Sequence, residues 1–167
     1  MRVRRIVLLL AAAATLQFLF GASAYRRAFP VDWFLIATAT VARGGDFVRA
    51  VLTGAAAGLV EDSLAHQLLG MNAFAKAAIG YVLALVSVRV VVGGAWAVGA
   101  SVAVASVAND AIVAMLAYLL SQQPIVLASW ESVGRAGATG AAAAILETAW
   151  RFPWSDWWEK RRLRRLR

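Results

Sequence analysis

The chain has 167 residues, of which 62% are hydrophobic and only 16% are charged, and its mean hydropathy is +0.70. A soluble domain is typically about half apolar and about one quarter charged, so this composition indicates one small polytopic membrane domain. The absence of cysteine and the single histidine, His66, exclude disulfides, thiolate metal sites and multi-histidine zinc sites.

The net charge of +8 is concentrated near the two ends of the chain. Seven of the 17 lysines and arginines lie at Arg151 or beyond, and three more precede Ile6. Positive charge in these places is typical of the flanks of a membrane protein, so we do not expect nucleic acid as a partner.

The first apolar segment spans residues 6–24, close to the ~20 residues that a ~30 Å hydrocarbon core requires. Residues 22–24 imitate a signal-peptidase site, but the apolar stretch is longer than that of a usual signal peptide. The segments that follow are also apolar. We therefore expect an uncleaved first transmembrane helix.

The second apolar segment, residues 31–42, is short. About 12 residues make a helix of about 18 Å, which does not span a bilayer comfortably. A break at residues 43–46 separates it from a third segment, residues 47–66. The two segments are either short tilted spans or a re-entrant hairpin sheltered by other helices.

Three longer helices complete the predicted bundle. The fourth spans about residues 75–92, the fifth about residues 98–120, and the sixth lies between Trp130 and Trp150. These tryptophans are about 30 Å apart along a helix, which is typical of the two aromatic belts of a membrane. We expect an all-α domain over residues 1–150, followed by a basic, tryptophan-rich tail.

Six passes place both termini on one side of the membrane. Both termini are basic, and the positive-inside rule therefore places them in the cytoplasm. Arg43, Arg49 and Arg89 then also lie near the cytoplasmic face, whereas the loops near Asn72 and Gln122 lie outside. The predicted localisation is the bacterial cytoplasmic (inner) membrane.

Two acids in the apolar segments have an ordinary explanation. Glu131 precedes Arg135 by four residues, and Glu147 precedes Arg151 by four. An acid and a base at this spacing lie on the same face of a helix, so we expect two local ion pairs.

Three other acids, Glu61, Asp62 and Asp110, are harder to explain, and Asp110 has no base three or four residues away on its predicted helix. An acid at the centre of a membrane helix costs about 2.5–3.5 kcal/mol on insertion scales, so such acids normally face protein or water. Lys76 is the candidate partner for any of the three. The alternative for Asp110, which follows the polar Asn109, is protonation.

Gly54, Gly58 and Asp62 follow one another at intervals of four residues. On a helix they form a stripe of small residues that allows another helix to approach closely, with the acid at its end. Asp62 could instead cap a helix that begins at Ser63, because aspartate is a favoured N-cap residue. Both interpretations remain open.

The sequence contains no pattern typical of catalysis or of a cofactor site. There is no Ser-His-Asp set, phosphate-binding loop or metal-ligand spacing, and we predict a protein that is not an enzyme. The second half does not repeat the interrupted helices of the first, as an ion-coupled transporter usually would.

The C-terminal tail combines aromatic and basic side chains that could contact anionic lipid, although the same charges also anchor the topology. These residues are Trp154, Trp157, Trp158, Lys160, Arg161, Arg162, Arg164, Arg165 and Arg167.

Residues 54–81 contain the pattern Gly54-x-x-x-Gly58-Leu59-x-x-Asp62-x-Leu64, then Leu69-Gly70-x-x-Ala73-Phe74 and Gly80-Tyr81. This pattern resembles the core of the bacterial rod shape-determining protein MreD family. The chain length, helix count and first apolar helix agree with that family, and the tryptophan-rich tail departs from it.

The resemblance implies a six-helix fold similar to that of the S components of energy-coupling-factor transporters. It also implies a non-enzymatic inner-membrane protein of lateral-wall peptidoglycan synthesis. Its partners would be the bitopic scaffold MreC and, directly or through MreC, the glycosyltransferase RodA with its penicillin-binding transpeptidase and the MreB filament. Gly54, Gly58, Leu59, Asp62, Leu69 and Gly70 would pack helices or contact a partner.

A second hypothesis is a small-molecule-binding subunit of the S-component type. It would use an outward cavity lined by loop residues such as Asn72, Gln122 and Gln123. These positions are poor in aromatic and charged side chains, which argues against a tight site for a polar ligand.

Overall fold

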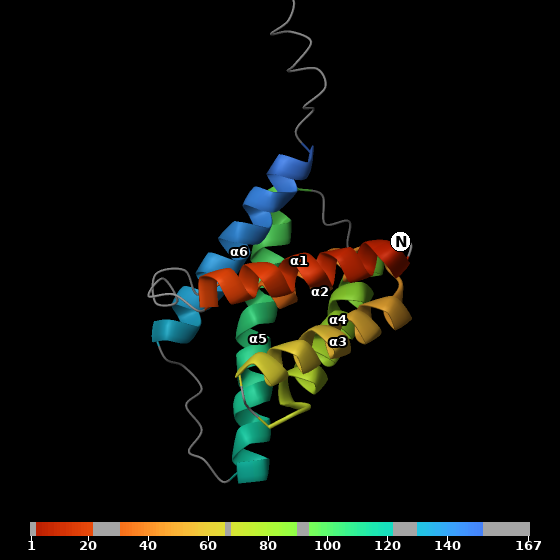
Figure 1. Ribbon diagram of the computed structural model, residues 1–167. Helices are drawn as coiled ribbons and strands as arrows, with labels where there is room; N and C mark the ends of the chain where they lie inside the picture. Colours follow the sequence, from red (N-terminus) through yellow and green to blue (C-terminus); the bar gives the residue numbers. More distant parts are fainter. Residues whose placement is uncertain (1–2, 22–30, 66–67, 90–93, 122–129, 152–167) are drawn as a thin grey trace, which may run out of the picture.

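The computed structural model describes residues 3–21, 31–65, 68–89, 94–121 and 130–151, and within them it contains six α-helices and no strand. The helices are α1 (Val3–Gly21), α2 (Trp33–Ala42), α3 (Phe47–Ala65), α4 (Met71–Arg89), α5 (Ala95–Ser121) and α6 (Trp130–Arg151) (Figure 1). The all-α prediction is confirmed. Each predicted segment corresponds to one helix, although α4 begins at Met71, earlier than predicted.

Two of these helices are long and apolar enough to cross a membrane. They are α4 and residues 95–120 of α5. α2 has ten residues and is a shorter apolar helix, as its sequence predicted, whereas α3 runs without a break for 19 residues.

The short helix α2 lies at the centre of the bundle and contacts each of the five other helices described. Most of its side chains are buried, and Phe34, Leu35 and Ala42 are completely inaccessible. A helix that is apolar on all sides is stable only when other helices surround it. α1 crosses one side of α2 and packs on it through Ala13, next to Phe34 (Figure 1).

α3 and α4 lie side by side and form the most extensive helix pair of the bundle (Figure 1). Gly54 and Gly58 of α3 face α4 so closely that a Cβ on either would overlap the α4 backbone, at Lys76 and at Asn72 respectively. The stripe of small residues therefore serves a helix of the same chain. α5 and α6 approach each other in the same way, since Gly99 and Gly140 face each other.

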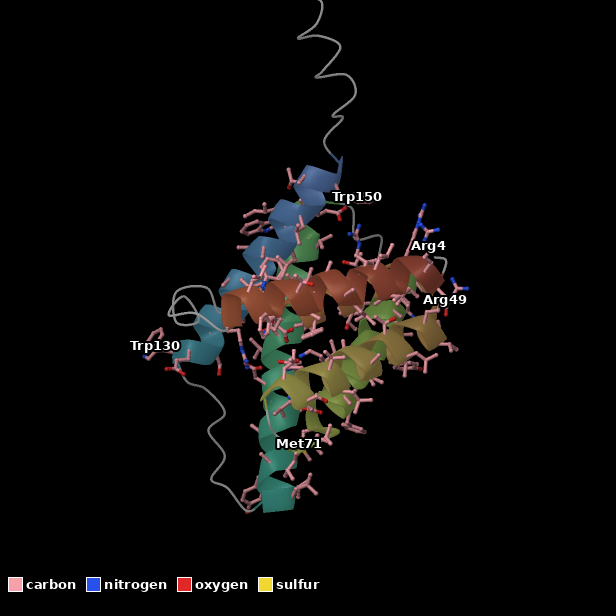
Figure 2. The ribbon with its side chains drawn as sticks, viewed as in Figure 1. Arg4, Arg49, Met71, Trp130 and Trp150 are labelled. Carbon is pink, nitrogen blue, oxygen red and sulfur yellow. The ribbon has the colours of Figure 1, made fainter. Side chains whose placement is uncertain are left out.

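Two basic side chains mark one end of the bundle. Arg4 and Arg49 lie at this end, and Met71 lies away from it (Figure 2). The turn between α2 and α3 lies against the end of α4, because a Cβ on Gly45 would be 3.1 Å from Val88 Cγ2. The ends of α2 and α6 also meet there, where Arg43 forms a two-point ion pair with Glu147.

The close contact between α3 and α4 predicts different effects for two Gly→Ala substitutions. Gly58→Ala places a methyl group against the α4 backbone, and we expect it to destabilise the protein by roughly 1–3 kcal/mol. Gly137→Ala on α6 is the control, because no atom lies within 4 Å of its added Cβ. Alanine is a better helix former than glycine, so Gly137→Ala should raise the free energy of unfolding by up to about 1 kcal/mol. Thermal unfolding of the purified variants in detergent measures both changes in stability. Equal changes for Gly58→Ala and Gly137→Ala would contradict the close contact between α3 and α4.

Candidate functional site

The most unusual feature of the interior is a lysine without access to solvent. The Lys76 side chain on α4 is fully buried, and its Nζ lies 2.7 Å from Asp32 Oδ2 and 2.7 Å from Glu61 Oε2. A buried ammonium group is tolerated only with anionic partners, because desolvation costs several kcal/mol per ion. Of the three predicted partners, Glu61 is the one that pairs with Lys76, and Asp32 joins it.

Asp32 connects three helices at this point. Its Oδ1 accepts a hydrogen bond from the backbone N–H of Leu35 at 2.8 Å, which makes Asp32 the N-cap of α2. Its Oδ2 accepts a hydrogen bond from Lys76 of α4. Its own backbone N–H donates to Thr139 Oγ1 of α6 at 3.1 Å. One residue therefore holds the start of α2 against both α4 and α6.

A second ion pair lies next to this group. Arg135 Nη2 of α6 donates to Asp110 Oδ1 of α5. Asp32 and Glu61 also lie within electrostatic range of Arg135. We call the five residues Asp32, Glu61, Lys76, Asp110 and Arg135 the buried charge cluster; the side chain of Arg135 is 41% exposed and lies at its edge. It draws on α3, α4, α5 and α6 and on the cap of α2.

The predicted local pair of Glu131 with Arg135 is wrong, because Arg135 turns to Asp110 instead. Glu131 is exposed to solvent, and an exposed pair is worth little compared with charge compensation for a half-buried acid. Glu147 pairs with Arg43 of α2, which its local spacing did not predict. The side chain of Arg151, its predicted partner, lies outside the described residues.

Asp62 forms a separate polar contact at the turn between α3 and α4. Its Oδ2 accepts a hydrogen bond from Gly70 N at 2.8 Å, and its Oδ1 accepts from Asn72 N at 3.2 Å and Asn72 Nδ2 at 2.8 Å. These donors belong to the first turn of α4, so Asp62 caps the helix that follows its own. Gly70 has φ of +105°, a conformation that glycine adopts readily.

This arrangement corrects three predictions. Asp62 does not cap a helix beginning at Ser63, because α3 continues to Ala65. The fourth helix begins at Met71 and not at Ala75, because the Asp62 carboxylate satisfies amide groups at its start. Asn72, predicted to line a loop cavity for a small ligand, is instead buried in that first turn.

The other predicted site residues divide between the interior and the surface. Asn109 is buried on α5. Leu59 and Leu69 are 46% and 72% exposed, so they remain available to a partner. Gln122, Gln123 and the predicted lipid-contact residues of the tail, from Trp154 onward, lie outside the described residues.

One small cavity lies among the described helices. A cavity of about 20 Å³ lies between α2, α4 and α5, lined mainly by apolar side chains such as Ala39, Leu83 and Val102. This volume suffices for about one water molecule. Within the same part of the chain, no three His, Cys, Asp or Glu side chains are grouped so that they could hold a metal ion.

Sequence reasoning missed Asp32, although a signal was present. Asp32 directly precedes an apolar segment, two residues after Pro30, and aspartate before such a segment is a typical N-cap. A cap would have placed a carboxylate at the start of α2, close to any base that α4 could supply. No comparable pattern in the sequence predicts the hydrogen bond between Asp32 and Thr139.

Comparisons of this chain with protein-family models, with curated proteins and with solved structures return no match.

The burial of Lys76 predicts a large effect for Lys76→Met. The substitution leaves Asp32 and Glu61 without their shared cation, and we expect a loss of roughly 3–5 kcal/mol in the free energy of unfolding. Arg89→Met at the exposed end of the same helix is the matched control and should cost less than about 1 kcal/mol. Denaturant or thermal unfolding in detergent measures both. Similar losses for the two variants would argue against the cluster as an organising contact.

The capping role of Asp62 predicts a separate effect. Asp62→Ala removes three hydrogen bonds from the turn and should destabilise the protein by roughly 1–3 kcal/mol. Ser63→Ala changes the adjacent, exposed residue and should have little effect. Hydrogen exchange of the Gly70 and Asn72 amides should rise in Asp62→Ala only. Unchanged protection of these amides would contradict the cap.

Proposed function

We propose that this chain is a non-enzymatic assembly component of the cell-elongation machinery in the bacterial inner membrane, similar to MreD. Its direct partner would be an MreC-like bitopic scaffold protein. The glycosyltransferase RodA, its penicillin-binding transpeptidase and an MreB-type filament would be reached directly or through that scaffold.

The distribution of polar and apolar side chains supports a membrane location. The charge cluster is inside, while large apolar side chains are exposed on every described helix except α2; examples are Leu8, Leu52, Phe74, Leu119 and Ile145. Soluble monomers rarely expose continuous apolar surface on this scale, whereas a bilayer would cover it. The proposed topology is six passes.

The position of the basic side chains supports the proposed orientation. Arg4 and Arg49 lie at the same end of the bundle, and the ends of α2, α4 and α6 meet there (Figure 2). The positive-inside rule assigns this end to the cytoplasm. The turn at residues 68–70, which Asp62 holds, would then face the opposite side.

The main support for the proposal is that the residues of the MreD-like pattern fall into two groups, one inside the bundle and one on its surface. Its small and polar members, such as Gly54, Gly58 and Asp62, hold α3 against α4. Its large apolar members point outward: they are Leu59, Leu64, Leu69, Phe74 and Tyr81. A pattern of this kind builds a rigid helix pair with an apolar outer surface, which suits helix–helix binding more than chemistry.

Co-purification tests the proposal. The tagged chain is expressed with the MreC-like scaffold of the same organism, and the scaffold should be recovered with the wild type. The double variant Leu59→Ala/Leu69→Ala removes two outward side chains of the pattern and should reduce recovery at least about tenfold, since ~1.4 kcal/mol suffices for that.

Leu119→Ala/Leu120→Ala is the matched control, because these α5 leucines are 62% and 65% exposed. Recovery should match the wild type. Equal loss in both double variants would show that the α3–α4 surface is not the docking surface, and no recovery with the wild type would refute the proposed function.

A further inference from the structure

The buried charge cluster contains one more acid than it can compensate. Asp110 and Arg135 form a balanced pair, and Asp32 and Glu61 both contact the single ammonium group of Lys76. If all five groups are ionised, the group around Lys76 carries a net charge of −1 in the protein interior. An uncompensated buried charge is costly, and a buried ionisable group avoids the cost by becoming neutral.

Asp32 is the acid that the fold holds as an anion. Its carboxylate accepts hydrogen bonds from Lys76 Nζ and from Leu35 N. It also stands at the N-terminus of α2, where the helix dipole favours negative charge.

Glu61 lacks this support. Its Oε2 lies 2.7 Å from Lys76 Nζ, an ion-pair distance, and no second donor reaches this atom. Glu61 lies within the body of α3 and receives no capping amide there. Other buried oxygens, Asn109 Oδ1 and Asp110 Oδ2, also lack donors. The described interior is therefore short of donors as well as of positive charge.

We propose that Glu61 is a proton-binding site, with Asp32 as the counter-ion of Lys76 and Glu61 as a neutral carboxylic acid beside them. One proton removes the excess negative charge and adds one hydrogen-bond donor. The charged groups that face Glu61 are Asp32 of the α2 cap, Lys76 of α4 and Arg135 of α6, with Asp110 of α5 behind Arg135.

The ligand is a proton and not a metal cation. The Lys76 ammonium already lies between the two carboxylates, where it repels a second cation and fills the space that one would need. Glu61 is also the acid with access to the surroundings, since its side chain is 18% exposed and that of Asp32 is 7% exposed. Exchange of the proton therefore proceeds through Glu61.

Infrared spectroscopy of the purified full-length protein at neutral pH tests this assignment. A protonated carboxyl group absorbs at higher frequency than a carboxylate, and carbon-13 in the carboxyl group lowers that frequency. We expect one protonated band in the wild type, shifted by labelled glutamate and unchanged by labelled aspartate. The band should be absent from Glu61→Gln and present in Asp110→Asn.

Unfolding temperature provides a second measurement. Glutamine is a neutral replacement of similar shape, so Glu61→Gln should unfold at the temperature of the wild type and far above Lys76→Met. The proposal is overturned if the wild type has no protonated band or if labelled aspartate shifts it. It is also overturned if the band survives in Glu61→Gln or if this variant is as unstable as Lys76→Met.

Discussion

The ammonium group of Lys76 is buried and needs negative charge beside it, and the fold depends on this requirement. Because a lone charge in this position would cost several kcal/mol, α4 can occupy its place only if acids from other helices come to it. Asp32 supplies a counter-charge and brings the start of α2 and, through Thr139, part of α6, while the carboxyl group of Glu61 brings α3. α2 is short and apolar and cannot fix its own position in the bundle. The polar contact of Asp32 with Lys76 fixes the start of this helix.

The rest of the bundle uses two other means to bring helices together. Small residues allow the backbones of α3 and α4, and those of α5 and α6, to approach closely. Asp62 then closes the α3–α4 pair by capping the second helix from the first. Because small and polar residues hold these helices together, the helix contacts do not require every large apolar side chain. Many large apolar side chains face outward instead. The described part of the chain thus keeps its charge cluster inside and has large apolar side chains on its exterior.

The sequence predicted the parts of this structure that depend on local pattern. Hydropathy located six helices, and the spacing of Gly54 and Gly58 predicted a close helix contact. Contacts over long distances in the chain were predicted only in part, since Glu61 was among the expected partners of Lys76 and Asp32 was not. Arg135 had a suitable acid one turn away and still turned to Asp110, because the bundle brings α5 beside α6. Aspartate is a good cap for its own helix or for the next, and only the fold decides which one Asp62 serves.

Single-cysteine labelling tests most directly the central proposal, that α3 and α4 form a membrane-spanning pair built around a buried charge. The chain has no cysteine, so Gly44→Cys, Leu69→Cys and Ala75→Cys can each be probed with a membrane-impermeant maleimide in intact and opened cells. We expect reaction at position 69 in intact cells, at position 44 only after the cells are opened, and at position 75 in neither case, because Ala75 is fully buried next to Lys76. Reaction at positions 44 and 69 from the same side, or at position 75 in the folded protein, would contradict it.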